Sequence, residues 1–336
     1  MEPWVIALVA ISAVLHLAWN VRLKTAGDPL RAATIGLLAG SVVIVPVGIL
    51  IWLLRGAAPL PVEGVLLGVA SGFAEAAYFI LLAAAYRRGD LSVVYPVARG
   101  TAPLLAVLFG VVVLGEQLGL AGSLGVVGLM VGFLVLQRPW RAIARARLGR
   151  AGWRREMTAA DETGNLVGVQ PHLARAGDAP VEVINAAPRT STTDKAILFA
   201  LAAGVMIATY TAIDRVGTRQ IDPFLYAAIL WVVGSVLLVL WIAFVAGGDL
   251  LRYGNEAARR AAVGGILTLV AYLCILVALS VAPLSGVAPL RESATVFAAA
   301  WGAVRMGEAS DRTEAARRIG ASVLIVGGAV LLALGS

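Results

Sequence analysis

The chain has 336 residues, of which 60% are apolar and only 14% are charged, and its mean hydropathy is +0.89. Soluble globular chains carry about 25% charged residues, so a pair of soluble domains is excluded and a polytopic membrane protein is predicted. The single cysteine, Cys274, excludes an intramolecular disulfide framework and a cysteine metal site. The net charge of +7 rests on 25 arginines and two lysines against 20 acidic residues, a bias that gives no evidence for nucleic-acid binding.

Apolar runs recur along the whole chain. A bilayer core about 30 Å thick is crossed by roughly 20 apolar residues of helix. Runs of that size predict an all-α protein of ten transmembrane helices. The expected spans are 3–22, 32–54, 64–86, 91–114, 118–137, 196–213, 223–246, 261–281, 285–305 and 318–335.

One long polar stretch divides five spans from five. It predicts three regions: a five-helix unit at 1–137, a linker at 138–194 and a second five-helix unit at 195–336. Seven arginines between Arg138 and Arg155 predict contact with anionic lipid headgroups. The rest of the linker is expected to be largely flexible.

The two five-helix units are related by an internal repeat. YPVARGTAPLLAVLFGVVVLGEQ at 95–117 aligns without a gap with VAPLRESATVFAAAWGAVRMGEA at 287–309. The alignment pairs Arg99 with Arg291. The starts of the units agree more loosely, through Trp19-Asn20 against Tyr210-Thr211 and Asp28-Pro29 against Asp222-Pro223.

An odd number of spans in each unit predicts that the two copies cross the bilayer in opposite directions. Such inverted repeats are typical of secondary transporters, in which the halves rock about a shared interface. The repeat therefore predicts alternating access, with a substrate site between the halves near the membrane midplane.

The paired Pro-containing helices that lead to Gly-Glu, each followed by a Gly-rich last span, resemble the EamA-type transporters of the drug/metabolite transporter superfamily. The opening VLHLAWNVRLKTAGDP is similar to a branch of permease-like proteins found near phosphonate-utilisation genes. The resemblance covers nearly the whole chain except the linker, which is longer than the family's usual connection. It implies a ten-helix inverted-repeat fold and transport of a small metabolite.

Charged residues within spans are functional candidates, because each costs about 2.5 to 3.5 kcal/mol to insert. Arg99 and Arg291 lie in the repeat register, and their planar donors suit carboxylate or phosphonate oxygens. Equally, each arginine could be neutralised within the bundle by Glu75 or Glu292. Glu75 is also a candidate proton carrier, since apolar surroundings disfavour a charged carboxylate, and Tyr78 shares its helix face.

Polar and aromatic residues add further candidates for substrate contact. The first span carries His16, Trp19 and Asn20 on one face, where they line a cavity or join helices. Tyrosine hydroxyls near the interface between the halves could bind polar substrate groups, although core packing is the plainer reading of each. These are Tyr95, Tyr210 and Tyr272.

Two other features of the repeat predict structural roles. Glu116 and Glu308 lie at the ends of their spans, where capping or anchoring of a loop is the preferred reading over transport. Gly128 and Gly132 have the spacing of close helix contacts.

The chain contains no HExxH, GxSxG, paired-cysteine or GxxxxGK[ST] motif, so neither an enzyme nor an ATP-driven pump is predicted, and no cofactor or metal is expected. The leading interpretation is a secondary transporter of a small organic metabolite, anionic or zwitterionic, in the cytoplasmic membrane of a bacterium. One alternative is a flippase that holds a lipid-linked phosphate headgroup. Another is a membrane sensor without transport.

Charge and family resemblance disagree on orientation. The resemblance implies cytoplasmic termini, which would leave three basic residues in short cytoplasmic loops, Arg55, Arg215 and Arg219, against twelve on the other side. Because basic loops normally remain cytoplasmic, the count predicts outside termini and a cytoplasmic linker. The twelve are Arg22, Lys24, Arg31, Arg87, Arg88, Arg252, Arg259, Arg260, Arg305, Arg312, Arg317 and Arg318.

Overall fold

The computed structural model describes residues 1–24, 28–88, 91–137, 190–245, 254–292 and 312–335, and every element in these ranges is helical. The all-α prediction is therefore confirmed for the described residues. The elements are α1 (Pro3–Lys24), α2 (Pro29–Leu54), α3 (Val62–Tyr86), α4 (Leu91–Leu108), the π-helical turn η1 (Phe109–Val113), α5 (Leu120–Gln137), α7 (Thr190–Gly217), α8 (Pro223–Phe244), α9 (Asn255–Val281), α10 (Leu284–Glu292) and α12 (Arg312–Gly335).

Five helices in the described ranges are long and apolar enough to cross a membrane. They are α2, α3, α8, α9 and the part of α7 from Asp194 to Gly217. Shorter apolar helical stretches occur in α1, in α4 with η1, in α5 and in α12. The multi-pass character is thus supported by length and composition, whereas the full set of ten spans stays a prediction.

The Asp-Pro pairs of the repeat both begin helices. Asp28 accepts hydrogen bonds from the backbone of Leu30 and Arg31 at the start of α2, at 3.0 and 3.3 Å. Asp222 accepts from the backbone of Phe224 at the start of α8, at 2.9 Å. In both cases a side-chain oxygen satisfies an end N–H, and proline follows at the first helical position. The loose agreement between the repeat starts therefore has a structural cause.

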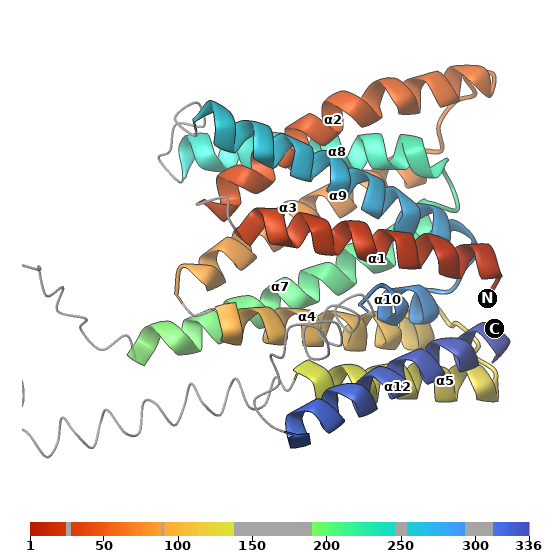
Figure 1. Cartoon of the computed structure of the whole chain (residues 1–336). Helices are drawn as coiled ribbons and strands as arrows, with labels where there is room; N and C mark the ends of the chain where they lie inside the picture. The colour runs from red at the N-terminus through yellow and green to blue at the C-terminus, as the bar shows by residue number, and fades with distance from the viewer. Residues whose placement is uncertain (25–27, 89–90, 138–189, 246–253, 293–311, 336) are drawn as a thin grey trace, which may run out of the picture.

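Helices of the two halves pack mainly against one another. α2 packs on α8 and α9, α3 on α7 and α8, α1 on α9, α4 on α7, and α5 on α12 (Figure 1). The largest apolar core accordingly combines both halves, including Leu37 of α2, Phe79 of α3, Trp231 of α8 and Leu269 of α9. The largest core is therefore shared by the two halves.

Glycines allow several of these helices to approach closely. A Cβ on Gly265 of α9 would lie 2.2 Å from the Cα of Gly36 on α2. A Cβ on Gly132 of α5 would lie 2.6 Å from a side-chain carbon of Ile325 on α12. The packing role predicted for Gly132, and for Gly128 one turn earlier, is confirmed.

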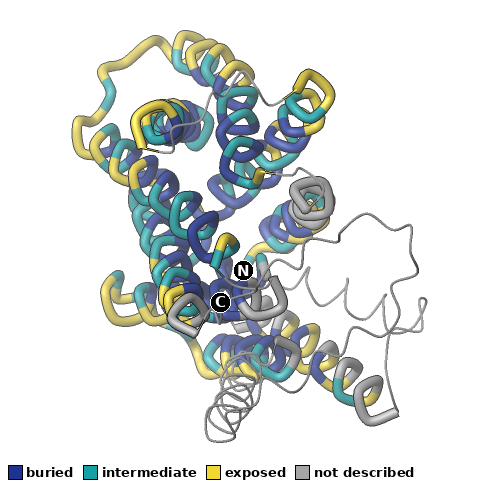
Figure 2. The backbone as a smooth tube through the Cα atoms, turned by 90° about the vertical axis from the view of Figure 1, so that its left-hand side faces the viewer, coloured by how far each residue is buried: buried dark blue, intermediate teal, exposed yellow. Residues whose placement is uncertain are grey.

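Large apolar side chains also cover outward faces of the bundle. Val42, Leu54 and Leu120 are each at least 74% exposed, and Figure 2 shows exposed residues along the outer faces of helices that are buried on the inner side. Soluble monomers rarely expose so much contiguous apolar surface, whereas a bilayer favours it.

Candidate functional site

A fully buried carboxylate, Asp214 of α7, lies at the centre of a polar cluster. Ser71 of α3 donates to Asp214 Oδ1 at 2.5 Å, and Tyr226 of α8 donates to the same oxygen at 2.9 Å. Tyr272 of α9 donates to Asp214 Oδ2. Four helices thus meet at one carboxylate, and three hydroxyl donors offset its removal from water.

Glu75 is a second buried carboxylate in this region. It follows Ser71 by four residues on α3, so the two side chains share a helix face. Glu75 is 6% exposed and lies within electrostatic range of Asp214, but its Oε2 has no hydrogen-bond partner among the described residues. Gly234 of α8 faces that oxygen, since a Cβ there would lie 3.4 Å from it. Glu75 therefore differs from Asp214 in having an unsatisfied oxygen.

A chain of aromatic rings passes beside the two carboxylates. Tyr78 of α3 and Tyr210 of α7 have centroids 6.1 Å apart, and Tyr210 and Tyr272 have centroids 6.0 Å apart. Trp231 of α8 continues the chain, 5.5 Å from Tyr272. These edge-to-face or tilted pairs are of the kind that aromatic rings prefer. Three of the predicted tyrosines are therefore brought together.

The two arginines of the repeat approach the same part of the molecule. Arg99 of α4 is 7% exposed, and Arg291 lies in the last turn of α10. Both guanidinium groups act electrostatically on Tyr210, and that of Arg291 also acts on Asp214 and Tyr272. The region thus combines two carboxylates with two guanidinium groups.

Five other predicted site residues have side chains outside the described part of the structure. Helix α1 includes His16, Trp19 and Asn20, α4 includes Tyr95, and α10 ends at Glu292. Their roles stay predictions.

The sequence interpretation missed Asp214 because the expected span ended at residue 213. That boundary was wrong, since α7 continues to Gly217. An aspartate four residues after Tyr210, in a continuous apolar helix, is the intramembrane charge that signals function. The same error placed Arg215 in a loop. Ser71, Tyr226 and Trp231 carried no signal beyond being polar or aromatic residues in apolar spans.

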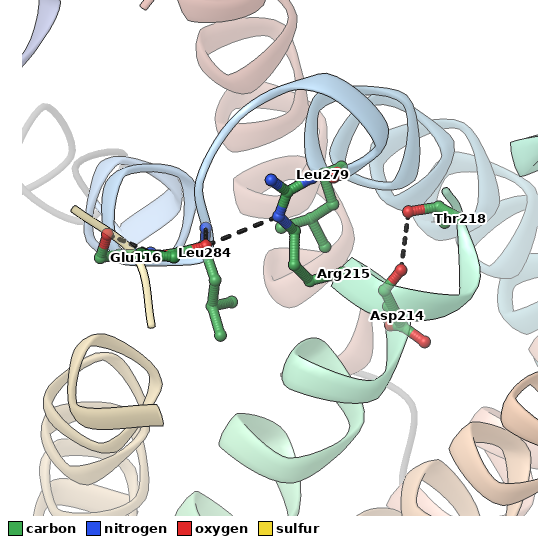
Figure 3. Close-up of polar contacts among 7 residues, drawn as sticks. Glu116, Asp214, Arg215, Thr218, Leu279 and Leu284 are labelled. Carbon is green, nitrogen blue, oxygen red and sulfur yellow. Dashed lines mark hydrogen bonds and ion pairs between the residues drawn. The ribbon is translucent and has the colours of Figure 1, made fainter. Parts of the chain in front are cut away.

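A second polar cluster lies at the end of the bundle, around Glu116 (Figure 3). Glu116 accepts hydrogen bonds from the backbone N–H groups of Leu284 and Ser285, at 2.6 and 2.9 Å, and from the Ser285 hydroxyl at 2.7 Å. Arg215 Nε lies 3.5 Å from Glu116 Oε1, and Arg215 also donates to the Leu279 carbonyl at 2.6 Å. Glu116 therefore caps α10 from a distant part of the chain, which confirms its predicted capping role.

Two glycines make this capping contact feasible. Gly115 has φ of +65°, a left-handed conformation that glycine adopts readily, and it turns the chain after η1. A Cβ on Gly110 would lie 2.5 Å from Glu116 Oε2. The Gly115-Glu116 pair is thus a helix end followed by a capping carboxylate, whereas Glu308, its counterpart in the repeat, lies outside the described residues.

Comparison with known proteins supplies the family. Residues 194–334 match the EamA-like transporter family. This part of the chain, within the expected second five-helix unit, is similar to EamA-like transporters. An EamA-type unit identifies a membrane transporter of the drug/metabolite transporter type, as the sequence resemblance implied. The branch found near phosphonate-utilisation genes stays a prediction.

One solved structure has a similar fold over nearly the full length of the chain. A structure entitled "Crystal structure of protein" is 18% identical, with a TM-score of 0.65, over 99% of this chain and 98% of that chain. At this identity the similarity concerns the fold alone. The comparison with curated proteins gives no match.

Proposed function

We propose that this EamA-type protein is a secondary transporter of a small organic metabolite, anionic or zwitterionic, that works by alternating access. The observation that carries the proposal is the composition of the buried polar cluster. Glu75 and Arg99 come from the first half of the chain, and Asp214, Tyr272 and Arg291 come from the second. A site built from both halves changes when the halves move.

The pattern of helix contacts supports two inverted five-helix units. The contact of α3 with α7 has its counterpart in that of α1 with α9, and α4 with α7 corresponds to α1 with α10. The pairs α2 with α9 and α3 with α8 correspond in the same way, whereas α2 with α8 and α5 with α12 join helices of equal rank. A pseudo-twofold axis between the halves produces this pattern.

The positions of the chain ends agree with this symmetry. Both termini lie at one end of the bundle, and α7 begins at the opposite end (Figure 1). A first unit with an odd number of crossings places the two units in opposite directions.

The Glu116 cluster supplies a closed end for such a cycle. It joins the segment after η1 to α7 and α10, at the end of the bundle where the termini lie. Access from that end requires these contacts to separate. The ion pair with Arg215 and the cap of α10 are then made and broken once in each transport cycle.

Flux from proteoliposomes tests the function. The purified protein is reconstituted with a lumenal mixture of carboxylic acids, amino acids and phosphonates, and mass spectrometry follows their loss against protein-free liposomes. We expect a subset of anions or zwitterions to leave faster with protein. Retention of every solute, or movement of labelled lipids between leaflets instead, would contradict the proposal, the latter in favour of a flippase.

We further propose a bacterial cytoplasmic membrane, with the arginine-rich linker on anionic lipids at the cytoplasmic face and no enzymatic activity. Arg215 is paired with Glu116 inside the bundle, so it no longer counts as a loop charge. Leaving Arg215 out of the count of basic residues in short loops increases the charge asymmetry that favours outside termini.

A further inference from the structure

An ion pair between Arg55 and Asp222 joins the two halves at the end of the bundle where the termini lie (Figure 1). Arg55 follows the last residue of α2, and its Nη1 lies 2.9 Å from Asp222 Oδ2. Asp222 begins α8, and its other oxygen accepts a hydrogen bond from the Phe224 N–H at 2.9 Å. One carboxylate therefore caps a helix of the second half and also binds a guanidinium group of the first half.

The turn that carries Asp222 fits closely against the first half. Ile221 is 5% exposed, and a Cβ on Gly64 of α3 would lie 2.6 Å from one of its side-chain carbons. The side chain of Asp222 is itself only 12% exposed, against 68% for that of Arg55. Opening of this end requires the turn to leave α2 and α3, and the ion pair then breaks.

The repeat provides no equivalent of this pair. Asp222 aligns with Asp28 at a spacing of 194 residues, and the same spacing aligns Arg55 with Asp249. Asp249 lies outside the described residues, but its charge alone excludes an ion pair with Asp28. Asp28 instead pairs with Arg31 of its own helix, with Nε and Oδ2 3.4 Å apart. The two repeat-related aspartates thus differ, because one pairs across the halves and the other within a single helix.

The second ion pair at the same end, between Glu116 and Arg215, does not differ between the repeats in this way. Glu116 aligns with Glu308 in the ungapped register, and the register of the repeat starts aligns Arg215 with Lys24. Both counterparts keep the sign of the charge. Of the two ion pairs, it is therefore the one between Arg55 and Asp222 that makes the two ends of the molecule unequal.

We propose that the Arg55–Asp222 pair is a one-sided latch, which makes the conformation closed at the terminus end the more populated state of the protein without substrate. Inverted repeats of equal sequence would close either end at equal cost, so residues that differ between the repeats decide which end is closed. An ion pair made in only one of two conformations shifts their ratio by its own contribution. The inference rests on the proposed alternating access and adds to it the state that the empty transporter occupies.

Distances between spin labels in the purified full-length protein, reconstituted in lipid without substrate, test the latch. In a background with Cys274→Ala, labels at Val62 and Val281 report the terminus end, and labels at Arg87 and Glu256 report the opposite end. Both label pairs join an end of α3 in the first half to an end of α9 in the second, and all four residues are exposed. Double electron–electron resonance then gives the share of molecules at each distance.

Two variants remove the pair in different ways. Arg55→Ala removes the guanidinium group, and Asp222→Asn removes the charge but keeps a side chain that caps helices well. Asp28→Asn is the matched control, since it makes the same change at the repeat-related cap and breaks only the pair with Arg31. Arg55→Lys keeps the charge and tests for recovery.

We expect the wild type to show mainly the short distance at the terminus end. Arg55→Ala and Asp222→Asn should each raise the ratio of open to closed molecules there about three- to tenfold, because a pair with one exposed partner contributes little more than a surface pair. The double variant should shift no further than either single variant, since both changes remove the same interaction. Arg55→Lys should restore part of the closed population, and Asp28→Asn should match the wild type at both ends.

Three results would overturn the latch: a wild type that is mainly open at the terminus end, closed populations in Arg55→Ala and Asp222→Asn equal to that of the wild type, or an equal shift in Asp28→Asn. If Arg55→Ala does not fold, Asp222→Asn, which retains a helix cap, carries the test. Flux is measured separately. A shift in population without flux of any solute contradicts only the transport function, whereas flux with unchanged populations contradicts only the latch.

Discussion

Replacement of Glu116 by alanine should weaken the end of the bundle much more than loss of an ordinary surface carboxylate. The change removes the acceptor of two backbone N–H groups at the start of α10 and of the Ser285 hydroxyl. Loss of a helix cap costs about 0.5–2 kcal/mol. It also removes the ionic partner of Arg215, at side-chain exposures of 9% for Glu116 and 12% for Arg215.

The ion pair contributes the larger part of this loss. Breaking a buried pair by removing one partner costs about 3–5 kcal/mol. Arg215 keeps its hydrogen bond to the Leu279 carbonyl, so the lower part of that range applies. Cap and ion pair together give an expected destabilisation of about 3–5 kcal/mol for Glu116→Ala. Glu116→Gln keeps one acceptor oxygen for the cap but loses the ion pair, so it should recover only part of the cap contribution of about 0.5–2 kcal/mol.

The measurement is the melting temperature of the purified protein, followed by tryptophan fluorescence. Glu256→Ala is the control, because Glu256 also pairs with an arginine, Arg260, but at side-chain exposures of 69% and 62%. An exposed pair of this kind contributes less than about 1 kcal/mol. If Glu116→Ala melted at the same temperature as Glu256→Ala, the view that Glu116 holds this end together would be wrong.

Further predictions concern packing, the arginines and orientation. Gly265→Ala should destabilise the protein by about 1–3 kcal/mol, since its Cβ would meet the backbone of Gly36, whereas Gly327→Ala, with no atom within 4 Å, should not; melting curves compare the two. Arg99→Lys and Arg291→Lys should each impair flux in proteoliposomes without reducing the amount in the membrane, because an ammonium group lacks the planar fork of donors; wild-type flux in both variants would contradict this. A fluorescent reporter at the C-terminus that works only in the cytoplasm should remain dark, and one that is active only outside should work; the reverse would show that the charge asymmetry misled.

The sequence predicted the all-helical, multi-pass character of the fold and only part of the polar cluster. Apolar runs are local signals, so long helices such as α2, α3 and α8 could be read directly, and the Asp-Pro pairs at Asp28 and Asp222 were visible as matching repeat starts, although their role as helix caps was not predicted. The register of the repeat paired Arg99 with Arg291 as candidate site residues, and both act electrostatically on Tyr210 in the structure. Such signals can be read from the sequence because each depends on neighbouring residues or on a repeated segment.

Other features depend on tertiary contacts that a pattern does not specify. Glu116 is 168 residues from Leu284, the first residue of the helix that it caps. No local sequence pattern predicts a contact over that separation. Asp214 was missed for a different reason. The arginine that follows it ended the expected span, although Arg215 is paired within the bundle and the helix continues past both residues.

The same two residues connect the centre of the molecule to its closed end. Asp214 and Arg215 are consecutive on α7, so their side chains leave the helix about 100° apart. Asp214 faces Ser71 and the tyrosines, and Arg215 faces Glu116 and Leu279. Figure 3 shows the two side chains leaving α7 in different directions. Because a rigid helix turns as a unit, a substrate that displaced the donors of Asp214 and rotated α7 would, in the proposed transport cycle, also displace Arg215 from Glu116. One helix would then join occupancy of the centre to closure of the end, which is the physical connection that the proposed alternating access requires.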